Sequence, residues 1–243
     1  MATDFDSYVL ADSNGDLIEL YLLVADEFRE FNAYAKSMFV PENNRPDRYY
    51  HLRDRFNEIR LDPWTCVQVE RAAIFLYLNR HCYNGLCRYN SRGGFNVPFG
   101  RYRKPYYPEA ELRHFHQKAN ERHLELYVMD YRRTMLAMTR PGDSLYLDPP
   151  YLPENNKAEG FTAYNSKGFG MADHLELTRL AAQAARSGVQ VVLSNHSRHD
   201  INKTYREYGA RLHFHSQPRA INSKTIGRIP AREVLAVWDG SNS

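Results

Sequence analysis

Two hydrophobic patterns alternate along the second half of the chain. Apolar runs without polar interruption are typical of parallel strands covered on both faces, whereas apolar residues three and four positions apart are typical of helices with one buried side. The continuous apolar run at 189–195 predicts a strand, and the helical spacing predicts a helix at about 171–187. Residues 144–148, 211–216 and 233–238 read as three further strands. Gly188 ends this helix, because glycine readily adopts the left-handed conformation that follows a helix C-terminus. We expect residues 144–195 to form a right-handed parallel crossover.

The first half of the chain begins with a similar strand and then becomes helical. Residues 8–11 form a short apolar run that predicts a buried strand. Apolar residues on one stripe predict a single helix from Asp16 to Met38, which the segment PENNRP at 41–46 ends. Later patterns predict helices at about 47–58, 65–82 and 109–121, a hairpin at 88–102 around Gly93-Gly94, and a strand at about 124–129.

Together these elements predict an α/β fold with a mixed sheet and an insertion. The strands and the helices between them form a sheet domain made of residues 1–40 and 124–243. Residues 41–123 have only helical and hairpin patterns, so we expect them to form a separate insertion.

The composition indicates a globular protein in a reducing compartment. The 243 residues are 43% hydrophobic and 25% charged, which is ordinary for a soluble domain. The three cysteines, Cys66, Cys82 and Cys87, are sparse and form no C-x-x-C pair, which argues against a disulfide scaffold. The sequence opens with no signal peptide, and no apolar run is long enough to span a membrane. We therefore expect a cytoplasmic protein that does not associate with membranes.

The net charge of +3 hides a basic segment within the predicted insertion. Residues 71–108 contain no aspartate or glutamate. The segment interleaves basic residues with aromatic ones, namely Arg71, Arg80, Arg88, Arg92, Arg101, Arg103 and Lys104 with Phe75, Tyr77, Tyr83, Tyr89, Phe95, Phe99, Tyr102, Tyr106 and Tyr107. This combination is typical of proteins that bind phosphates and flat bases. A solvated basic surface over an aromatic core has the same composition, and the segment alone does not separate the two.

The stretch SLYLDPPYLP at 144–153 carries the clearest candidate chemistry. A strand ends near Asp148, because the two prolines lack an N–H and fix φ. Ligands of open α/β sheets bind beyond the carboxyl ends of the strands. The Asp148 carboxylate and the Pro149 carbonyl could accept both protons of an exocyclic amine, and Tyr151 could stack on the ring that carries it. This arrangement suits methylation of the amino group of a flipped nucleobase. The alternative is a rigid turn followed by a surface tyrosine.

Several motifs give the chain a resemblance to a known family. They are DPPY at 148–151, FLYLNRHCYNGLCRYNSRGGFNVPFGRY at 75–102, KPYYPEAEL at 104–112, FTAY at 161–164 and SNH at 194–196. In these motifs the sequence resembles the Dam-type DNA adenine N6-methyltransferases of bacteria and phages over nearly its whole length. The resemblance implies a Rossmann-like methyltransferase fold and transfer of a methyl group from S-adenosylmethionine to adenine N6 in double-stranded DNA, usually within GATC. It also implies a direct transfer that needs neither a metal nor a covalent intermediate.

The resemblance also implies roles in catalysis and cofactor binding. The catalytic motif that holds the amine matches Asp148, Pro149, Pro150 and Tyr151. The cofactor-binding positions match Asp12, Ser13 and Asp148. Asp12 corresponds to the acidic residue after the family's second strand that binds the ribose hydroxyls, and a carboxylate suits a diol because it can accept two hydrogen bonds. A helix N-cap is a common alternative role for such an aspartate, and the two roles are compatible.

Other matched positions imply contacts with DNA. They are Tyr83, Asn84, Leu86, Arg88, Asn90, Pro98, Arg101 and Tyr102. Tyr83 and Asn84 match residues that enter the duplex when the adenine leaves it. Arg88 suits a guanine, because its guanidinium can donate to O6 and N7 together, with about 1–3 kcal/mol of discrimination. Arg101 is better suited to phosphates, which position a protein without reading sequence.

The sequence departs from the family pattern at its start. The family's KWAGGK-like segment and its glycine-rich PFxGxGxxF turn, which cradles the methionine part of the cofactor, do not occur. Met1 aligns just before the family's second strand, so we expect an N-terminally truncated sheet that lacks the family's central first strand. Loss of that strand leaves backbone groups unpaired on both neighbours, at about 1–3 kcal/mol for each buried group. An internal start in a longer gene, a truncated remnant and a second chain that supplies the strand are all compatible with the sequence.

These observations lead to one main hypothesis and two alternatives. The main hypothesis is a site-specific DNA adenine-N6 methyltransferase that is monomeric unless a second chain supplies the missing strand. We expect this chain alone to bind S-adenosylmethionine weakly or not at all. The first alternative is a catalytically inactive remnant that only binds DNA. The second is RNA base methylation, which uses the same chemistry but is disfavoured by the insertion's resemblance to duplex-reading hairpins.

Overall fold

The computed structural model of the chain describes residues 3–59, 65–151, 169–217 and 231–240. The chain divides into two compact units, Met1–Asp130 and Tyr131–Ser243. Each unit has a sheet and a hydrophobic core of its own. The FTAY motif at 161–164 and the side chain of Cys66 lie outside the described residues.

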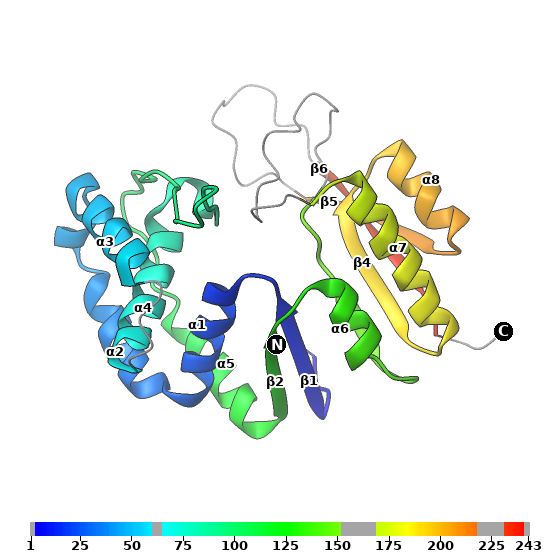
Figure 1. Cartoon of the computed structure of the whole chain (residues 1–243), viewed down its shortest axis with the longest axis horizontal. Coiled ribbons are helices and arrows are strands. Elements are labelled where there is room, and N and C mark those ends of the chain that lie inside the picture. Colours follow the sequence, from blue (N-terminus) through cyan, green and yellow to red (C-terminus); the bar gives the residue numbers. More distant parts are fainter. Residues whose placement is uncertain (1–2, 60–64, 152–168, 218–230, 241–243) are drawn as a thin grey trace. The chain divides into compact units, whose positions relative to one another are not determined.

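The first unit combines a two-stranded parallel sheet with a group of helices (Figure 1). Strand β1 (Ser7–Asp12) pairs with β2 (His123–Val128), in a register that runs from Ser7↔His123 to Asp12↔Val128. The helices are α1 (Gly15–Asp26), α2 (Phe28–Met38), α3 (Pro46–Glu58), α4 (Thr65–His81) and α5 (Glu109–Glu121), with 3-10 turns η1 (Pro41–Asn43) and η3 (Tyr83–Gly85). Because α1 follows β1 at once, the carboxyl end of β1 is held in a short loop before a helix N-terminus.

Helix α4 lies at the centre of the first unit. It contacts α1, α2 and α3, and its middle part is apolar on all sides, as expected for a helix surrounded by other helices. Ala73, Tyr77 and Leu78 on this helix are fully buried. Phe31 from α2 and Phe56 from α3 are buried in the same core. Burial of each large side chain contributes about 1.5–3 kcal/mol, so this aromatic core anchors the surrounding loops.

The single helix predicted from Asp16 to Met38 is wrong, because α1 and α2 are separate helices. The chain bends at Glu27, whose φ of −119° and ψ of 31° are not helical. Side chains of α5 bind the end of α1 at this bend: His116 Nδ1 lies 2.9 Å from the Ala25 oxygen, and Asn120 donates to the same oxygen at 3.0 Å. Phe28 stacks on His116 with ring centroids 4.9 Å apart. The bend thus depends on tertiary contacts that hydrophobic periodicity does not contain.

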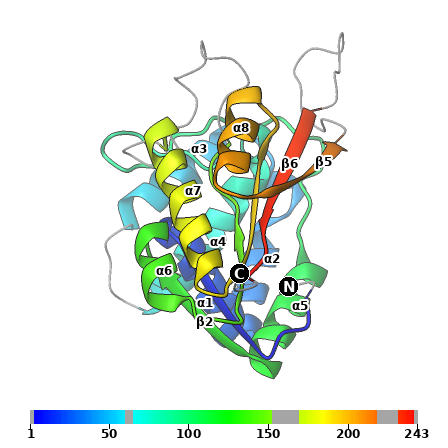
Figure 2. The same ribbon diagram turned by 90° about the vertical axis from the view of Figure 1, so that its right-hand side faces the viewer.

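The second unit contains a mixed four-stranded sheet in the order β3-β4-β6-β5. Strand β3 (Ser144–Leu147) is parallel to β4 (Gln190–His196), and β6 (Ala231–Trp238) is antiparallel to both β4 and β5 (Arg211–Gln217). Figure 2 shows helices α6 (Tyr131–Met138), α7 (Met171–Arg186) and α8 (His199–Glu207) of this unit. Helix α7 packs on β4 and α6, so it covers the strand that lies beside β3.

Most predicted elements of the second unit are confirmed. The four predicted strands and the helix that became α7 are present, and β3 and β4 are parallel as expected for the crossover. Gly188 follows α7 with a φ of +88°, which confirms its predicted role. Helices α6 and α8 were missed, because each is short and buries few residues: Met135 in α6, and Ile201 and Tyr205 in α8.

The predicted mixed sheet is divided between the two units. β1 is an edge of its two-stranded sheet and β3 is an edge of the four-stranded one, and among the described residues neither has a second strand partner. The pattern predicts a buried β1, but Val9 is 43% exposed, because an edge strand is covered on fewer sides. The predicted domains, 1–40 with 124–243 and an insertion at 41–123, stay a prediction, since the division at residue 130 groups residues by packing alone.

Candidate functional site

The predicted catalytic motif follows the carboxyl end of β3. The parallel register pairs Leu147 with Leu193, so Asp148 comes beside Ser194 of β4. The Ser194 hydroxyl lies 2.7 Å from Asp148 Oδ1 and donates to it. Asp148 is exposed, whereas Pro149 behind it is buried. The Asp148 carboxylate is therefore exposed to solvent, and the rigid proline that follows it is buried.

Tyr151 closes the motif beside the end of β4. Its ring meets the ring of His196 edge-on, with centroids 4.8 Å apart and planes 76° apart. Partial burial raises the pKa of the Tyr151 hydroxyl, a hydrogen bond with Ser194 acts in the opposite direction, and the nearby Asp148 carboxylate raises it further. Tyr151 therefore keeps its proton at neutral pH and presents an uncharged ring, as stacking on a base requires.

A buried polar network lies behind this end of β4. Asn195 is fully buried; its Oδ1 accepts from the His196 N–H at 2.7 Å, and its amide nitrogen lies 3.5 Å from His174 Nδ1. His174 Nε2 lies 2.7 Å from the Tyr205 hydroxyl. Burial lowers the pKa of His174 to about 4, so its imidazole is neutral at physiological pH. The network joins α7, α8 and β4 without placing any charge in the core.

Asp12 ends β1 in the first unit. Its Oδ1 accepts the backbone N–H of Asn14 at 2.7 Å, and burial raises the pKa of its half-buried carboxyl. Ser13 between them is exposed. The N-cap of α1 is Asn14, whose side chain accepts from the Asp16 N–H at 3.1 Å, so the alternative role of Asp12 as the N-cap is wrong. The two-residue loop leaves the Asp12 carboxylate at a strand end, as the resemblance requires.

Asn14 also connects this loop to the basic segment. Its amide nitrogen lies 3.3 Å from Cys87 Sγ, and its Oδ1 lies 3.3 Å from the Tyr89 hydroxyl. Tyr89 donates to Asp16 Oδ2 at 2.6 Å, and Asp16 also pairs with Arg71 of α4. The carboxyl end of β1 and the segment that contains the predicted base-reading residues are therefore tied together by side chains.

Two loops bring five of the predicted DNA contacts together. Tyr83, Asn84 and Leu86 come from the turn after α4, and Pro98 and Tyr102 come from the chain that returns beside it. The Tyr83 N–H donates to the Pro98 carbonyl at 2.8 Å, and the Asn84 N–H donates to the Tyr102 hydroxyl at 2.9 Å. Tyr83, Leu86 and Tyr102 are among the exposed large hydrophobic residues. Exposed apolar side chains on a braced pair of loops are available to a ligand.

Two features hold these loops in place: left-handed backbone at Asn84 and Arg101, and the close approach of the two loops at Gly100. Asn84 has a φ of +56° and Arg101 a φ of +54°, which non-glycine residues adopt only where the surroundings impose it. The Gly100 N–H donates to the His81 carbonyl at 2.7 Å. A Cβ added at Gly100 would lie 2.5 Å from the Cys82 carbonyl oxygen, so only glycine fits between the two loops.

Arg88 and Asn90 lie on the segment predicted as a hairpin, which forms a turn with isolated bridges, Tyr89↔Phe95 and Cys82↔Phe99, in place of two regular strands. Arg88 Nε donates to Asn96 Oδ1 at 2.8 Å, which orients the guanidinium. Asn90 Oδ1 accepts the backbone N–H groups of Arg92 and Gly94 at 3.0 and 2.9 Å, so it braces the turn. The Arg88 guanidinium thus has a fixed orientation. Asn90 stabilises the turn in addition to its predicted contact with DNA.

The aromatic residues of the basic segment divide into a buried and an exposed group. Phe75, Tyr77 and Phe95 are buried in the core of the first unit. Tyr83, Tyr102 and Tyr106 are exposed. The buried group supports the loops, and the exposed group gives them a surface with flat apolar faces next to basic side chains.

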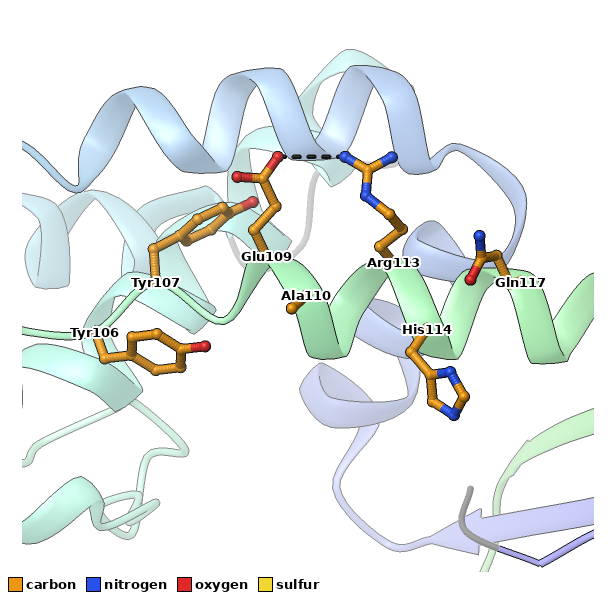
Figure 3. A pocket seen from close by; sticks show the side chains of 7 residues that line it. All are labelled: Tyr106, Tyr107, Glu109, Ala110, Arg113, His114 and Gln117. Carbon is orange, nitrogen blue, oxygen red and sulfur yellow. Dashed lines mark hydrogen bonds and ion pairs between the residues drawn. The ribbon is translucent and has the colours of Figure 1, made fainter.

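The described residues contain a surface pocket of about 500 Å³ that does not coincide with any predicted site (Figure 3). Its lining is Tyr106, Tyr107, Glu109, Ala110, Arg113, His114 and Gln117. Figure 3 shows Glu109 and Arg113 paired along α5, at 3.3 Å. None of these residues is a predicted catalytic, cofactor or DNA contact.

The described residues contain no group of three or more histidine, cysteine, aspartate or glutamate side chains placed to hold a metal ion. None of the helices in the same residues is both long enough and apolar enough to cross a membrane. Cys82 and Cys87 are free thiols, and burial raises the pKa of both.

Sequence reasoning gave no role to several residues that hold the predicted ones. Ser194 binds Asp148, Asn14 binds Asp12, and Asn96 binds Arg88. Ser194 lies within the SNH motif, so the motif was a signal although the contact was not predictable from it. Asn14 could have been found from its position two residues after a strand-end aspartate, because asparagine favours helix N-caps.

Known proteins resemble the chain over most of its length. A family model described as D12 class N6 adenine-specific DNA methyltransferase matches residues 1–221. The DNA adenine methylase of Serratia marcescens is 43% identical over 237 residues, which cover 97% of this chain and 83% of that protein. The DNA adenine methylase of Escherichia coli (strain K12) is 42% identical over 236 residues, which cover 97% of this chain and 81% of that protein. A DNA adenine methylase of Vibrio cholerae is 40% identical over 237 residues, with coverages of 97% and 81%.

Proposed function

The chain belongs to the family of D12 class N6 adenine-specific DNA methyltransferases, and from this membership we propose that it methylates adenine N6 within GATC in double-stranded DNA. S-adenosylmethionine is the proposed methyl donor. The observation that carries the proposal is the strand-end motif at 148–151, in which an exposed carboxylate held by Ser194 precedes two prolines and an uncharged tyrosine. The relatives named DNA adenine methylase support the same reaction class.

Asp148 is the proposed contact for the amine. Its carboxylate accepts a hydrogen bond from one N–H of the N6 amine, and the Pro149 carbonyl accepts a hydrogen bond from the other. The nitrogen lone pair then points away from both oxygens. The base itself stacks on Tyr151, which requires that the adenine leave the duplex. Transfer would break the methyl–sulfur bond of the sulfonium and leave N6 positively charged. The adjacent Asp148 carboxylate would stabilise that charge and take up the departing proton. Asp148 thus acts on the substrate amine directly.

Asp12 is the proposed contact for the ribose of the cofactor, with Ser13 beside it. The fit rests on chemistry that the loop offers: a half-buried carboxylate at a strand end, held by the Asn14 N–H, can accept two hydrogen bonds from a diol. When bound, S-adenosylmethionine supplies the methyl group from its sulfonium. The residues of the chain bind and orient it, and Asp148 is proposed to lie near it as well.

The two braced loops of the first unit are the proposed DNA interface. Tyr83 and Asn84 are proposed to enter the duplex, while Leu86, Pro98 and Tyr102 touch bases. Arg88 is proposed to read a guanine, and its orientation by Asn96 supports this role. Arg101 and the side chain of Asn90 are proposed to contact phosphates, as exposed residues beside the loops. Contacts of both kinds are needed, since phosphates position the protein and bases specify the site.

A methyl-transfer assay on matched duplexes tests this proposal. Because we expect the chain to bind S-adenosylmethionine weakly, the assay uses a high cofactor concentration. There we expect methyl incorporation into a GATC duplex and a loss of about tenfold or more when the guanine read by Arg88 is replaced. The variant Asp148→Ala should abolish incorporation, while Asp143→Asn, at the other end of β3, should keep it. Equal incorporation into GATC and altered duplexes would contradict the proposed specificity. Preference for a single-stranded RNA over the duplex would contradict the proposed substrate.

A further inference from the structure

Strand register places a buried hydroxyl beside the candidate amine-binding carboxylate. Leu147 pairs with Leu193 in the parallel β3–β4 ladder, so the next residues of the two strands, Asp148 and Ser194, are neighbours. Ser194 is 3% exposed, whereas Asp148 is exposed. The hydroxyl therefore reaches the carboxylate from the protein side and leaves the solvent side open to a ligand.

The single hydroxyl proton of Ser194 has two acceptors within reach, and one is clearly better. Ser194 Oγ lies 2.7 Å from Asp148 Oδ1 and 3.4 Å from the Leu147 carbonyl oxygen. A hydroxyl donates one proton, and a short bond to an ionised carboxylate is about twice as strong as a bond between neutral groups. The proton is therefore directed at Oδ1. This contact limits rotation of the carboxylate and leaves Oδ2 as the oxygen with greater freedom to accept from a substrate.

The strand that carries Ser194 is held firmly on both sides. Leu193 and Asn195 are each 0% exposed, and Asn195 belongs to the neutral network with His174 and Tyr205. A side chain between two buried neighbours on a central strand cannot drift far. The backbone at Ser194 is consequently held rigidly, so its hydroxyl can fix the orientation of the exposed Asp148 carboxylate.

We propose that Ser194 is a positioning residue for methyl transfer, whose hydroxyl fixes Asp148 Oδ1 so that Oδ2 faces the N6 amine. This inference rests on the proposed function of Asp148. Ser194 does not touch the reacting atoms; it sets the geometry of a residue that does. A misplacement of about 1 Å at a reacting group can cost about 100-fold in rate, so the effect belongs in the catalytic step and not in DNA affinity.

Steady-state and single-turnover assays of Ser194→Ala test the proposal. We expect kcat to fall about 10- to 100-fold while KM for the GATC duplex changes less than about twofold. Ser194→Thr, which keeps the hydroxyl, should restore most of the rate. Ser144→Ala is the matched control, because Ser144 makes a similar contact across the same two strands, to Gln190 at 3.3 Å, at their far end. Unchanged kcat in Ser194→Ala, or an equal loss in Ser144→Ala, would overturn the proposal.

A second measurement needs no activity and separates failure of this inference from failure of the proposed function. The unfolding free energies of the wild type, Ser194→Ala, Asp148→Ala and the double variant form a thermodynamic cycle. We expect Ser194→Ala to destabilise the protein only while the Asp148 carboxylate is present. Additive effects would show that the contact does not exist and would overturn the inference. A coupled pair in a protein that transfers no methyl group would instead refute the proposed function alone.

Discussion

Two aspartates follow strands in the two units, and they obtain the same contact in different ways. Oδ1 of Asp12 and Oδ1 of Asp148 each accept one hydrogen bond of 2.7 Å. The donor to Asp12 is the backbone N–H of Asn14, two residues further along the same loop. The donor to Asp148 is the hydroxyl of Ser194, 46 residues away in the sequence. The first carboxylate is positioned locally, and the second only when β3 and β4 pair.

The surroundings of the two carboxylates differ as well. Near Asp12, ionised side chains form the support, because Asp16 pairs with Arg71 and accepts from Tyr89. Behind Asp148 the support is neutral, through Asn195 and His174. The proposed cofactor contact is therefore positioned locally beside charged side chains, and the proposed amine contact is positioned through a neutral core.

Acid should have the largest effect, and it should act on one buried histidine in each unit. Burial lowers the pKa of His174 to about 4 from an ordinary value near 6.5, and does the same for His81 in the first unit. A lowered histidine pKa means that the unfolded chain binds the proton more tightly. Stability is therefore complete above about pH 6.5 and is lost as the pH falls towards 4, by on the order of 3 kcal/mol for each group.

Unfolding free energies between pH 7 and pH 4.5, together with histidine ring chemical shifts, measure this effect. We expect the signals of His81 and His174 to keep their neutral positions down to about pH 5. Titration of either ring near pH 6.5 in the folded protein would show that it is not buried as described.

Substitution of Gly100 should have the next largest effect and should be confined to the first unit. An added Cβ would lie 2.5 Å from the Cys82 oxygen and 2.6 Å from the Tyr102 ring, so Gly100→Ala must separate the two loops. We expect a loss of about 1–3 kcal/mol in unfolding free energy and weaker binding of the GATC duplex. In Gly15→Ala the nearest atoms lie at 3.9 Å, so its stability should be nearly unchanged. Similar effects of both variants in denaturant unfolding would argue against the close approach at Gly100.

Removal of the Tyr89 hydroxyl should have the smallest effect. Tyr89→Phe deletes the 2.6 Å hydrogen bond to Asp16 while keeping the ring in place, and a partly buried hydrogen bond contributes on the order of 1 kcal/mol. Tyr106→Phe is the control, because its hydroxyl binds Glu111 on the surface, where such a contact contributes little. Thermal unfolding compares the two variants. A larger loss in Tyr106→Phe would show that the charged support of the Asp12 loop is not what stabilises the first unit.

Local chemistry explains why much of the fold could be predicted from the sequence. The two prolines after Asp148 predict the end of β3, and Gly188 predicts the end of α7, because each residue dictates its own backbone conformation. The same reasoning fails at Glu27, where contacts with α5 bend a segment whose periodicity is continuous. Short helices such as α6 also escaped prediction, since one buried residue, Met135, gives no period.

The candidate site could be predicted in part for the same reason. Asp12 and Asp148 were found because each follows an apolar run that ends at a polar residue. The residues that aim them differ: Asn14 is close in sequence, whereas Ser194 becomes a neighbour only through strand pairing. The contact between Cys87 and Asn14 likewise joins segments 73 residues apart, which no local pattern encodes. The candidate carboxylates are therefore easier to predict from the sequence than the residues that hold them.

Single-turnover methyl transfer to a GATC duplex, measured as N6-methyladenine over a range of S-adenosylmethionine concentrations, tests the proposed roles of both carboxylates most directly. For Asp12→Ala we predict a transfer rate that approaches the wild-type value as the cofactor concentration rises. For Asp148→Ala we predict a rate that stays at least about 100-fold lower at any concentration, because the amine is no longer held. Recovery of Asp148→Ala at high cofactor, or no product from the wild type at any concentration, would contradict the assignment of Asp148 to the amine and Asp12 to the cofactor.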